Sequence, residues 1–378
     1  MGWAVLPLPT VCRNQDCVSC MEGTHRSEPI DAFKGVLILL VILGHNYYFG
    51  NYYTLWFSAL YNFHVASFLL LPFLFSMRTL EIGPFRDRVV RALAPQLAFL
   101  GMALVAYFAL YVEKSGAGIA DWLLAVGVAL LVQNEEVLNS AAGFRHFWFL
   151  PAMITMMCLL YLYDRGALWV RRAILGGAFV WHLTIGLVPL EVARYIPWGL
   201  PIVGFLLLPG LLVRYFYGRI RWRPLGDLLL IGLWIALLFL VVKWRLFMGL
   251  AGDLGSVRSL LDPGRLLFHG FFLLLSFFAL LRLAAYLPSL FAKLGQVSLK
   301  LFLIVPLLWQ MFWMAGGSRL SAESDVGRLL LVLGSMVLMV ALGYALSRWI
   351  EQSRWNALLF PRSLAQWSQG LRPWQRER

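Results

Sequence analysis

Long apolar runs alternate with short polar segments along most of the chain. Each run is close to the roughly 20 residues that an α-helix needs to cross a bilayer. The predicted spans are 35–50, 57–76, 89–112, 146–163, 173–188, 197–214, 225–242, 266–282, 299–315 and 328–347. A further run, 119–133, is short for a crossing and is typical of a re-entrant or interfacial segment. We expect an all-α, polytopic integral membrane helix bundle of about ten spans with one such short segment.

The composition is that of a chain that lies almost wholly in a membrane. Hydrophobic residues make up 61% of the 378 residues and charged residues 13%, which excludes an ordinary soluble domain. We divide the chain into a cytoplasmic N-terminal segment, 1–30, a transmembrane domain, 31–350, and a basic cytoplasmic tail, 351–378. The N-terminal segment is too short to bury a core of its own.

Basic residues mark one surface of the predicted bundle. If 119–133 does not cross, every second connection is basic and the others are neutral, acidic or mixed. The basic residues of this surface are Arg78, Arg86, Arg88, Arg91, Arg165, Arg171, Arg172, Arg214, Arg219, Arg221, Arg223, Arg282, Lys293 and Lys300, followed by the arginine-rich tail. The positive-inside rule then places both termini in the cytoplasm, whereas a crossing at 119–133 would invert every later loop. These loops and anionic lipid account for the net charge of +13, so we expect a bilayer and no nucleic acid as partner.

The first predicted span carries ionisable residues on one face. Asp31 and Lys34 lie at its charged start, and His45 lies far along it. On a helix, Lys34 and His45 are about 16 Å apart along the axis and about 20° apart around it, and Asp31 is within about 40° of His45. An ionisable residue inside a membrane is costly and marks a functional site by default. His45 is a candidate general base, with an interfacial histidine beside an aromatic belt as the alternative.

The second predicted span repeats this plan. His64 lies near the same outer depth as His45, and Arg78 closes the inner end on roughly the same face, with Pro72 between them as a kink. Two neighbouring helices thus place a histidine near the outside and a cation at the inner end. This repetition indicates a path through the membrane.

Arginines open the third predicted span. Arg86, Arg88 and Arg91 either anchor the helix at the cytoplasmic surface or bind an anion, because guanidinium groups on one helical turn bind phosphates well. A donor with several phosphates and a long thiol arm fits the second interpretation. Its phosphates would lie on the arginines and its thioester would reach the histidines.

The remaining polar residues are weaker candidates. His146 and Trp148 lie at the outer start of the fourth predicted span, where they line a cavity or anchor the helix. His182 and His269 have no matching charged stripe, so we expect them to pack or to line a pore. Near the N-terminus, a group of four residues has the composition of a zinc site. The alternative interpretation is that its cysteines are reduced cytosolic thiols, and we expect no metal. Its residues are Cys12, Cys17, Cys20 and His25.

Short motifs, in order along the chain, resemble those of acyltransferase family 3, a family of polytopic membrane acyltransferases. These motifs are RSEPIDAFKG, the GH ending the first span, the FH opening the second, FRDRVVRALAP, WFL in the fourth, LGQVSLKLFLIVP in the ninth and IEQSRW after the last. They extend over about residues 26–355, nearly the whole chain. Many members O-acetylate bacterial cell-surface and secreted polysaccharides. Within the family, the chain is similar to xanthan-type exopolysaccharide acetyltransferases, which modify mannose on a lipid-linked repeat unit.

The resemblance implies a catalytic group. Arg26, Asp31 and Lys34 match the opening motif of the family, with Lys34 where many members have arginine. His45 matches the histidine that is treated as catalytic, and His64 resembles a histidine found in a subset of members. We expect His45, Asp31 and His64 to be the catalytic residues.

The resemblance also implies a donor site. Arg88 and Arg91 match an R-x-x-R element that is associated with acyl-CoA. The expected acyl-CoA-binding residues are Arg26, Lys34, Arg78, Arg86, Arg88 and Arg91, and His146 and Trp148 are candidates on the acceptor side. One departure from the family pattern is Val305, which stands before Pro306 where many relatives have histidine.

Together, these observations predict a membrane-bound O-acyltransferase of the bacterial inner membrane. It would transfer an acetyl group from cytosolic acetyl-CoA, its co-substrate, to a sugar hydroxyl of an exopolysaccharide or of its lipid-linked repeat unit, alone or with the polysaccharide assembly machinery. The alternatives are a polysaccharide or lipid-linked-sugar transporter or flippase, for which we see no internal repeat, and a non-catalytic scaffold. Acetyl-CoA binding distinguishes the enzyme from a flippase.

Overall fold

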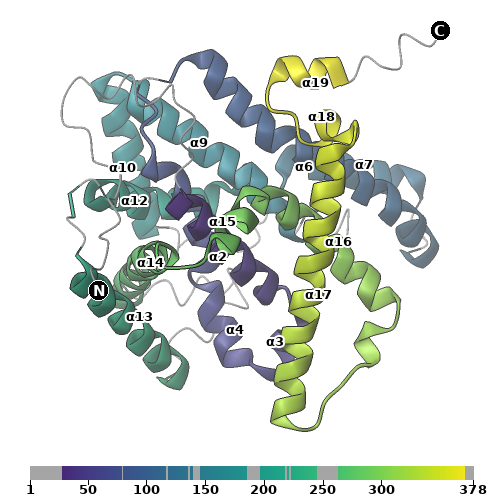
Figure 1. Ribbon diagram of the computed structural model, residues 1–378. Coiled ribbons are helices and arrows are strands. Elements are labelled where there is room, and N and C mark those ends of the chain that lie inside the picture. The colour runs from purple at the N-terminus through teal and green to yellow at the C-terminus, as the bar shows by residue number, and fades with distance from the viewer. Residues whose placement is uncertain are drawn as a thin grey trace.

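The computed structural model describes residues 28–78, 80–115, 118–134, 137–138, 145–184, 196–217, 219–220, 223–244 and 263–370. Within these ranges every regular element is a helix, which confirms the predicted all-α class. Arg26 and the possible zinc ligands lie outside the described residues. Figure 1 shows a helical bundle with α2 near its centre and the long α17 running along one side.

Helix α2, Glu28–Gly44, is the central helix of the bundle. Phe33, Leu37 and Ile38 are completely buried, although they point in different directions around the helix. A helix that is apolar all round needs neighbours on every side. These neighbours are α5 (His64–Leu70), α14 (Pro263–Ala284), α15 (Ser289–Gln296), α16 (Ser298–Met314) and α17 (Asp325–Gln352).

Helices α2 and α15 cross at two glycines. A β-carbon on Gly35 would overlap the carbonyl oxygen of Phe291, and a β-carbon on Gly295 would overlap the carbonyl oxygen of Asp31. Small residues permit such close backbone approach between helices in membranes. Helix α15 is bent by 118° from α14, so this connection, which the hydropathy pattern left between two spans, packs into the bundle.

The second predicted span is broken into three pieces. These are α4 (Thr54–Tyr61), α5, and a 3₁₀ turn, η1 (Leu71–Leu74), which contains Pro72 as the expected irregularity. At the break between α4 and α5, the side chain of Asn62 donates to the carbonyl oxygen of Ser58 at 2.7 Å. Side-chain bonds of this kind compete with the helical ladder. The break separates Tyr61 from His64 and determines where both side chains lie.

A short helix, α3 (Tyr47–Tyr52), follows α2. Asn46 caps α3 by accepting from the backbone N–H groups of Tyr48 and Phe49. Its amide also donates to the carbonyl oxygen of Val332 and to Oγ of Ser335, both at 3.0 Å. One buried asparagine thus joins the end of α2 to α17.

Helix α6 (Ile82–Ser115) is the third predicted span, and α7 (Ile119–Val132) is the short apolar segment after it. Helix α7 has 14 residues and ends one residue before the predicted segment does, and whether it crosses stays a prediction. Gln133 ends α7 in a left-handed conformation, with φ of 49°. The buried amide of Gln96 donates to Oε1 of Gln133 at 3.0 Å and to the carbonyl oxygen of Phe147 at 2.9 Å.

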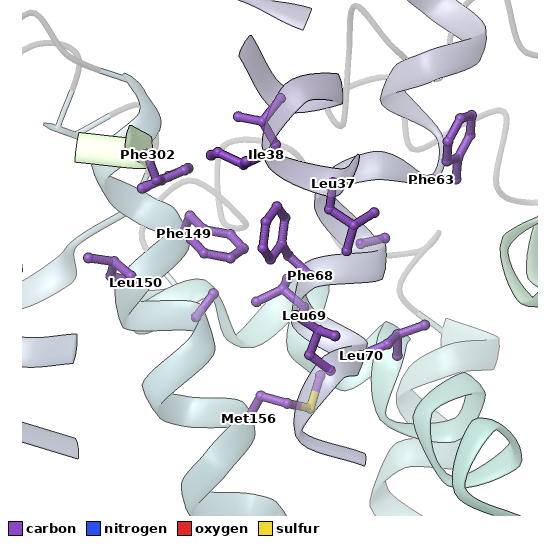
Figure 2. Packing of buried hydrophobic residues seen from close by; sticks show 14 of the residues in the cluster. Leu37, Ile38, Phe63, Phe68, Leu69, Leu70, Phe149, Leu150, Met156 and Phe302 are labelled. Carbon is purple, nitrogen blue, oxygen red and sulfur yellow. The ribbon is translucent and has the colours of Figure 1, made fainter. Parts of the chain in front are cut away.

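The core lies between α2, α5, α9 and α16. Figure 2 shows Phe149 beside Phe68 and Phe302, with ring-centroid distances of 5.9 and 4.8 Å. The other described helices surround this core. They are η2 (Arg145–Trp148), α9 (Phe149–Arg165), α10 (Leu168–Thr184), η4 (Pro197–Gly199), α12 (Leu200–Tyr217), α13 (Pro224–Trp244), η6 (Gly317–Arg319), α18 (Trp355–Leu359) and α19 (Leu364–Gly370).

Each predicted span overlaps a helix, but not every such helix is long and continuous. Among the described residues, 5 helices are long and apolar enough to cross a membrane, or up to 6 if the bent pair α14–α15 is one span. Helices α2, α9, α10 and α16 have 17 residues each, just below that length. The predicted number of spans therefore stays a prediction.

Helices α13 and α17 expose long apolar faces, as expected of helices that contact lipid. Leu228 and Leu229 of α13 are 68% and 67% exposed, and Leu330 and Val337 of α17 are 65% and 67% exposed. Apolar surface of this extent would be unstable in water and is stable in hydrocarbon. These faces support the membrane character of the bundle.

One buried ion pair joins α13 to α14. The guanidinium group of Arg282 donates to both carboxylate oxygens of Asp227, at 2.8 and 2.5 Å, and Asp227 is completely buried. The hydroxyl of Tyr286 donates to the same carboxylate at 2.6 Å. A fork of this geometry compensates for much of the cost of burying the charges.

Candidate active site

The two histidines predicted to be catalytic come together at one end of α2, which we call the histidine end. His45 follows the last residue of α2, and His64 begins α5 after the break. The ring of Tyr61 meets both imidazoles edge to face, with centroids 6.4 Å from His45 and 4.8 Å from His64. Tyr61 was not among the predicted site residues, because its position three residues before His64 is its only signal in the sequence.

His64 is completely buried, and its hydrogen bond determines its tautomer. Nδ1 lies 2.7 Å from the carbonyl oxygen of Leu60. A carbonyl oxygen only accepts, so Nδ1 carries the hydrogen and, in the neutral ring, Nε2 carries the lone pair. Nε2 has no hydrogen-bond partner among the described residues. Its lone pair therefore meets no donor within the described part of the protein.

Nε2 of His64 faces the end of α2 at a glycine. A β-carbon on Gly44 would lie 3.1 Å from Nε2 of His64 and 3.2 Å from Cε2 of Tyr61. Real side chains rarely approach a neighbour this closely. The glycine of the GH pair thus leaves room for the imidazole and the phenol beside His45.

Tyr61 connects His45 to the backbone of α2. Its hydroxyl donates to the carbonyl oxygen of Gly44 at 3.0 Å. The hydroxyl oxygen of Tyr61 also lies 3.5 Å from Nδ1 of His45. A phenol that donates to a carbonyl keeps lone pairs with which it accepts from another N–H. In this arrangement Nδ1 of His45 carries the hydrogen and Nε2 is the basic nitrogen.

His269 supports the break before His64. Its Nε2 lies 3.1 Å from the carbonyl oxygen of Asn62, where the ladder of α4 ends. His182 stacks on Phe205 at 4.6 Å, and Phe205 stacks on His269 at 5.6 Å. The two histidines ranked as packing or pore-lining residues thus share one aromatic stack, and His269 also contacts the backbone beside the candidate site.

The opposite end of the bundle gathers cations, and we call it the basic end, comprising Lys34, Arg78, Arg88, Arg91 and Arg214. Lys34 donates to the carboxylate of Asp31 at 2.8 Å, and Asp31 is 1% exposed at the crossing with α15. Asp31 is thus held at the basic end and not beside the histidines. Its predicted catalytic role stays a prediction.

Arg88 reaches a small network around Met77. Nη1 of Arg88 lies 3.5 Å from Sδ of Met77, and the backbone N–H of Met77 donates to Oδ2 of Asp164 at 2.7 Å. Asp164 is buried and pairs with Arg214 at 2.7 Å. Asp164 thus joins α9, α12 and the segment before α6. Arg214 was predicted only as a basic residue of the cytoplasmic surface, and Asp164 was not predicted.

The remaining arginines predicted for the donor lie on the same surface. The side chains of Arg78 and Arg86 are exposed, and the carbonyl oxygen of Arg78 accepts from Arg165 at 2.8 Å. Nε of Arg91 donates to the carbonyl oxygen of Arg362 at 2.8 Å. The predicted donor residues that the structure describes therefore lie on α2, on α6 and in the segment before α6.

The histidine end and the basic end are separate sites. Along α2, Lys34 and His45 are about 16 Å apart at the helical rise per residue. A compact molecule is too short to contact both ends at once, whereas an elongated molecule with an anionic head and a reactive tip can do so. This separation is the geometry that the sequence predicted for a donor with a long arm.

The acceptor-side candidates receive less support. Trp148 ends η2 and contacts the ring of Phe149 at 6.3 Å, and the side chain of His146 lies outside the described residues. The backbone of Phe147, between them, is tied to Gln96. Trp148 therefore belongs to a packed segment, and its role in acceptor binding stays a prediction.

These features define an integral membrane protein with an imidazole site at one end of its central helix and a cationic site at the other. Residues 28–348 match the family described as "Acyltransferase domain", acyltransferase family 3. The match covers most of the chain, which therefore belongs to this family.

One curated relative adds to this comparison. The chain is 29% identical over 209 residues to "Nodulation protein NolL" of Sinorhizobium fredii (strain NBRC 101917 / NGR234), an alignment that covers 50% of each protein. The chain thus spans about half the length of the curated relative that it matches. No solved structure matches the chain.

Proposed function

We propose that the protein transfers an acetyl group from acetyl-CoA to a sugar hydroxyl of a bacterial exopolysaccharide or of its lipid-linked repeat unit, with mannose as the first sugar to test. The observation that carries the proposal is the pair His45 and His64 around Tyr61, placed at the far end of α2 from the cations. The family supplies the reaction class, acyl transfer.

The donor would bind at the basic end. Arg88 and Arg91 offer guanidinium groups to the phosphates of acetyl-CoA, and Lys34 lies at the start of the helix that leads to the histidines. In this proposal the basic end faces the cytoplasm of the bacterial inner membrane, where acetyl-CoA is made, and both termini are cytoplasmic. The positive-inside rule supports that orientation.

In this proposal an imidazole at the histidine end acts as the general base. Nε2 of His45 or of His64 removes the proton of the sugar hydroxyl, while the oxygen of that hydroxyl attacks the thioester carbonyl carbon. The carbon–sulfur bond breaks, the acetyl group stays on the sugar oxygen, and the proton passes to the departing sulfur to give free CoA. A relay in which one imidazole first carries the acetyl group outward uses the same residues and the same overall balance.

The test measures label from radiolabelled acetyl-CoA in lipid-linked or polymeric glycan. Membranes would contain the intact chain, His45→Ala, His64→Ala or the double variant Arg88→Ala/Arg91→Ala. His182→Ala is the matched control, because His182 is also a membrane histidine but contacts Phe205 and neither His45 nor His64.

We expect incorporation with the intact chain and with the control, and loss in the three site variants. Full incorporation by both histidine variants would overturn the base assignment. No incorporation into any surface glycan, together with no acetyl-CoA binding, would overturn the enzyme and favour the transporter.

A further inference from the structure

The C-terminal segment, residues 353–370, lies beyond the family match and folds back onto the basic end. In Figure 1, α18 and α19 lie at the top of the bundle beside α6. Nε of Arg91 donates to the carbonyl oxygen of Arg362 at 2.8 Å, and the backbone N–H of Leu364 donates to Oδ1 of Asp87 at 3.0 Å. The segment thus bonds to the stretch of α6 that carries the R-x-x-R element.

Apolar packing holds the same segment in place. Phe360 is 8% exposed, and its ring lies 5.8 Å from the ring of Phe99 on α6. Lys300 of α16 lies 5.3 Å above the ring of Phe360 and donates to Glu351 and to Asn356, at 3.0 and 3.2 Å. The segment between α18 and α19 is therefore fixed from two sides and is part of the fold.

This arrangement concentrates positive charge. Arg88 and Arg91 are three residues apart on α6, so they lie on neighbouring positions of one helix face, and Arg362 is bonded to Arg91 through its backbone carbonyl. Among the described residues, no carboxylate forms an ion pair with Arg88, Arg91 or Arg362, whereas Glu351 pairs with Lys300 and with Arg348. Like charges held together without counter-ions raise the energy of the empty protein and favour a bound polyanion.

We propose that the C-terminal segment completes the phosphate-binding part of the acyl-CoA site, an inference that rests on the proposed function. The carbonyl oxygen of Arg362 accepts from Nε of Arg91, and the two terminal nitrogens of Arg91 would then donate to a phosphate. The exposed guanidinium group of Arg362 adds a further phosphate ligand on the segment that is bonded to Arg91. The donor site is then built from α6 and a segment more than 250 residues later, as the separation of 271 residues between Arg91 and Arg362 shows.

The experiment compares two probes on the full chain in nanodiscs. Acetyl-CoA carries the phosphates, and S-acetyl-pantetheine carries the thioester and the arm without the nucleotide. The variants are Arg362→Ala, and Arg354→Ala as the matched control, because Arg354 lies on the same segment but over the ring of Trp355 at 5.8 Å. Asp87→Asn weakens the bond to Leu364 and tests the docking of the segment.

We expect Arg362→Ala to weaken acetyl-CoA binding by about tenfold, the effect of one charge-assisted hydrogen bond, and to leave S-acetyl-pantetheine binding unchanged. Asp87→Asn should act in the same direction, and Arg354→Ala should bind like the intact chain. Equal acetyl-CoA affinity of the intact chain, Arg362→Ala and Asp87→Asn would overturn this inference and leave the proposed function standing. Absence of acetyl-CoA binding by the intact chain would instead overturn the proposed function.

Discussion

Nε2 of His64 faces the α-carbon of Gly44 so closely that a β-carbon there would lie 3.1 Å from the imidazole nitrogen. The GH motif that ends α2 therefore has two physical functions. Its histidine supplies one imidazole, and its glycine makes room for the second. This relationship joins two helices whose sequences alone do not show which residues face each other.

Gly44→Ala should reduce turnover without unfolding the protein. The added methyl group pushes on the ring of His64, and a misplacement of about 1 Å at a reacting group costs up to roughly a hundredfold in rate. The measurement is acetyl incorporation at saturating donor, beside the thermal unfolding midpoint in detergent. Gly50→Ala is the control, since its β-carbon would make ordinary contacts at 3.5 Å with Phe57. Equal turnover of the two variants would contradict the role given to Gly44.

Tyr61→Phe should lower kcat by about tenfold to a hundredfold while KM for acetyl-CoA stays unchanged. The change removes the hydroxyl that orients His45 and keeps the aromatic contact with His64. The basic end, where the donor is proposed to bind, is not altered. Tyr52→Phe is the control, because its hydroxyl accepts from the backbone N–H of Ala322 and contacts neither histidine. A rise in KM for the donor with kcat unchanged would count against this role.

Replacing Gly295 by alanine should destabilise the whole bundle and not the site alone. The methyl group would overlap the carbonyl oxygen of Asp31, so α15 has to move away from α2. Overpacking of this kind costs typically 1–3 kcal/mol, and more where backbone blocks it. The measurement is the midpoint of thermal unfolding in detergent, with Gly101→Ala, which has open space around it, as control. A midpoint equal to that of the control would show that α2 and α15 separate easily.

The ion pair between Asp227 and Arg282 gives a prediction about unpaired charge. Asp227→Ala leaves the guanidinium group of Arg282 buried without its carboxylate, which should cost about 3–5 kcal/mol. The double variant Asp227→Leu/Arg282→Met removes both charges and should recover much of that loss. Unfolding midpoints of the two variants in the same detergent decide between the outcomes. A double variant less stable than Asp227→Ala would mean that the pair contributes net stability.

Local pattern was enough to single out most residues of the candidate site. His45, His64, Arg88 and Arg91 stand out because an ionisable residue in an apolar run is costly, and helical spacing assigns each to one end. The same spacing placed Asp31 on the stripe of His45, which is correct along one helix. It did not reveal that Asp31 is buried against α15 and paired with Lys34.

By itself, the sequence determined the all-α class, the membrane character, the family, and the separation of imidazoles from cations along α2. These properties follow from composition, periodicity and short motifs, which act between residues near each other in the chain. Tertiary structure decided which residues meet across helices. It placed Tyr61 between His45 and His64, and it brought Arg362 to Arg91. Such contacts depend on how backbones pack at glycines and breaks, and no local pattern encodes the partner that a distant helix presents.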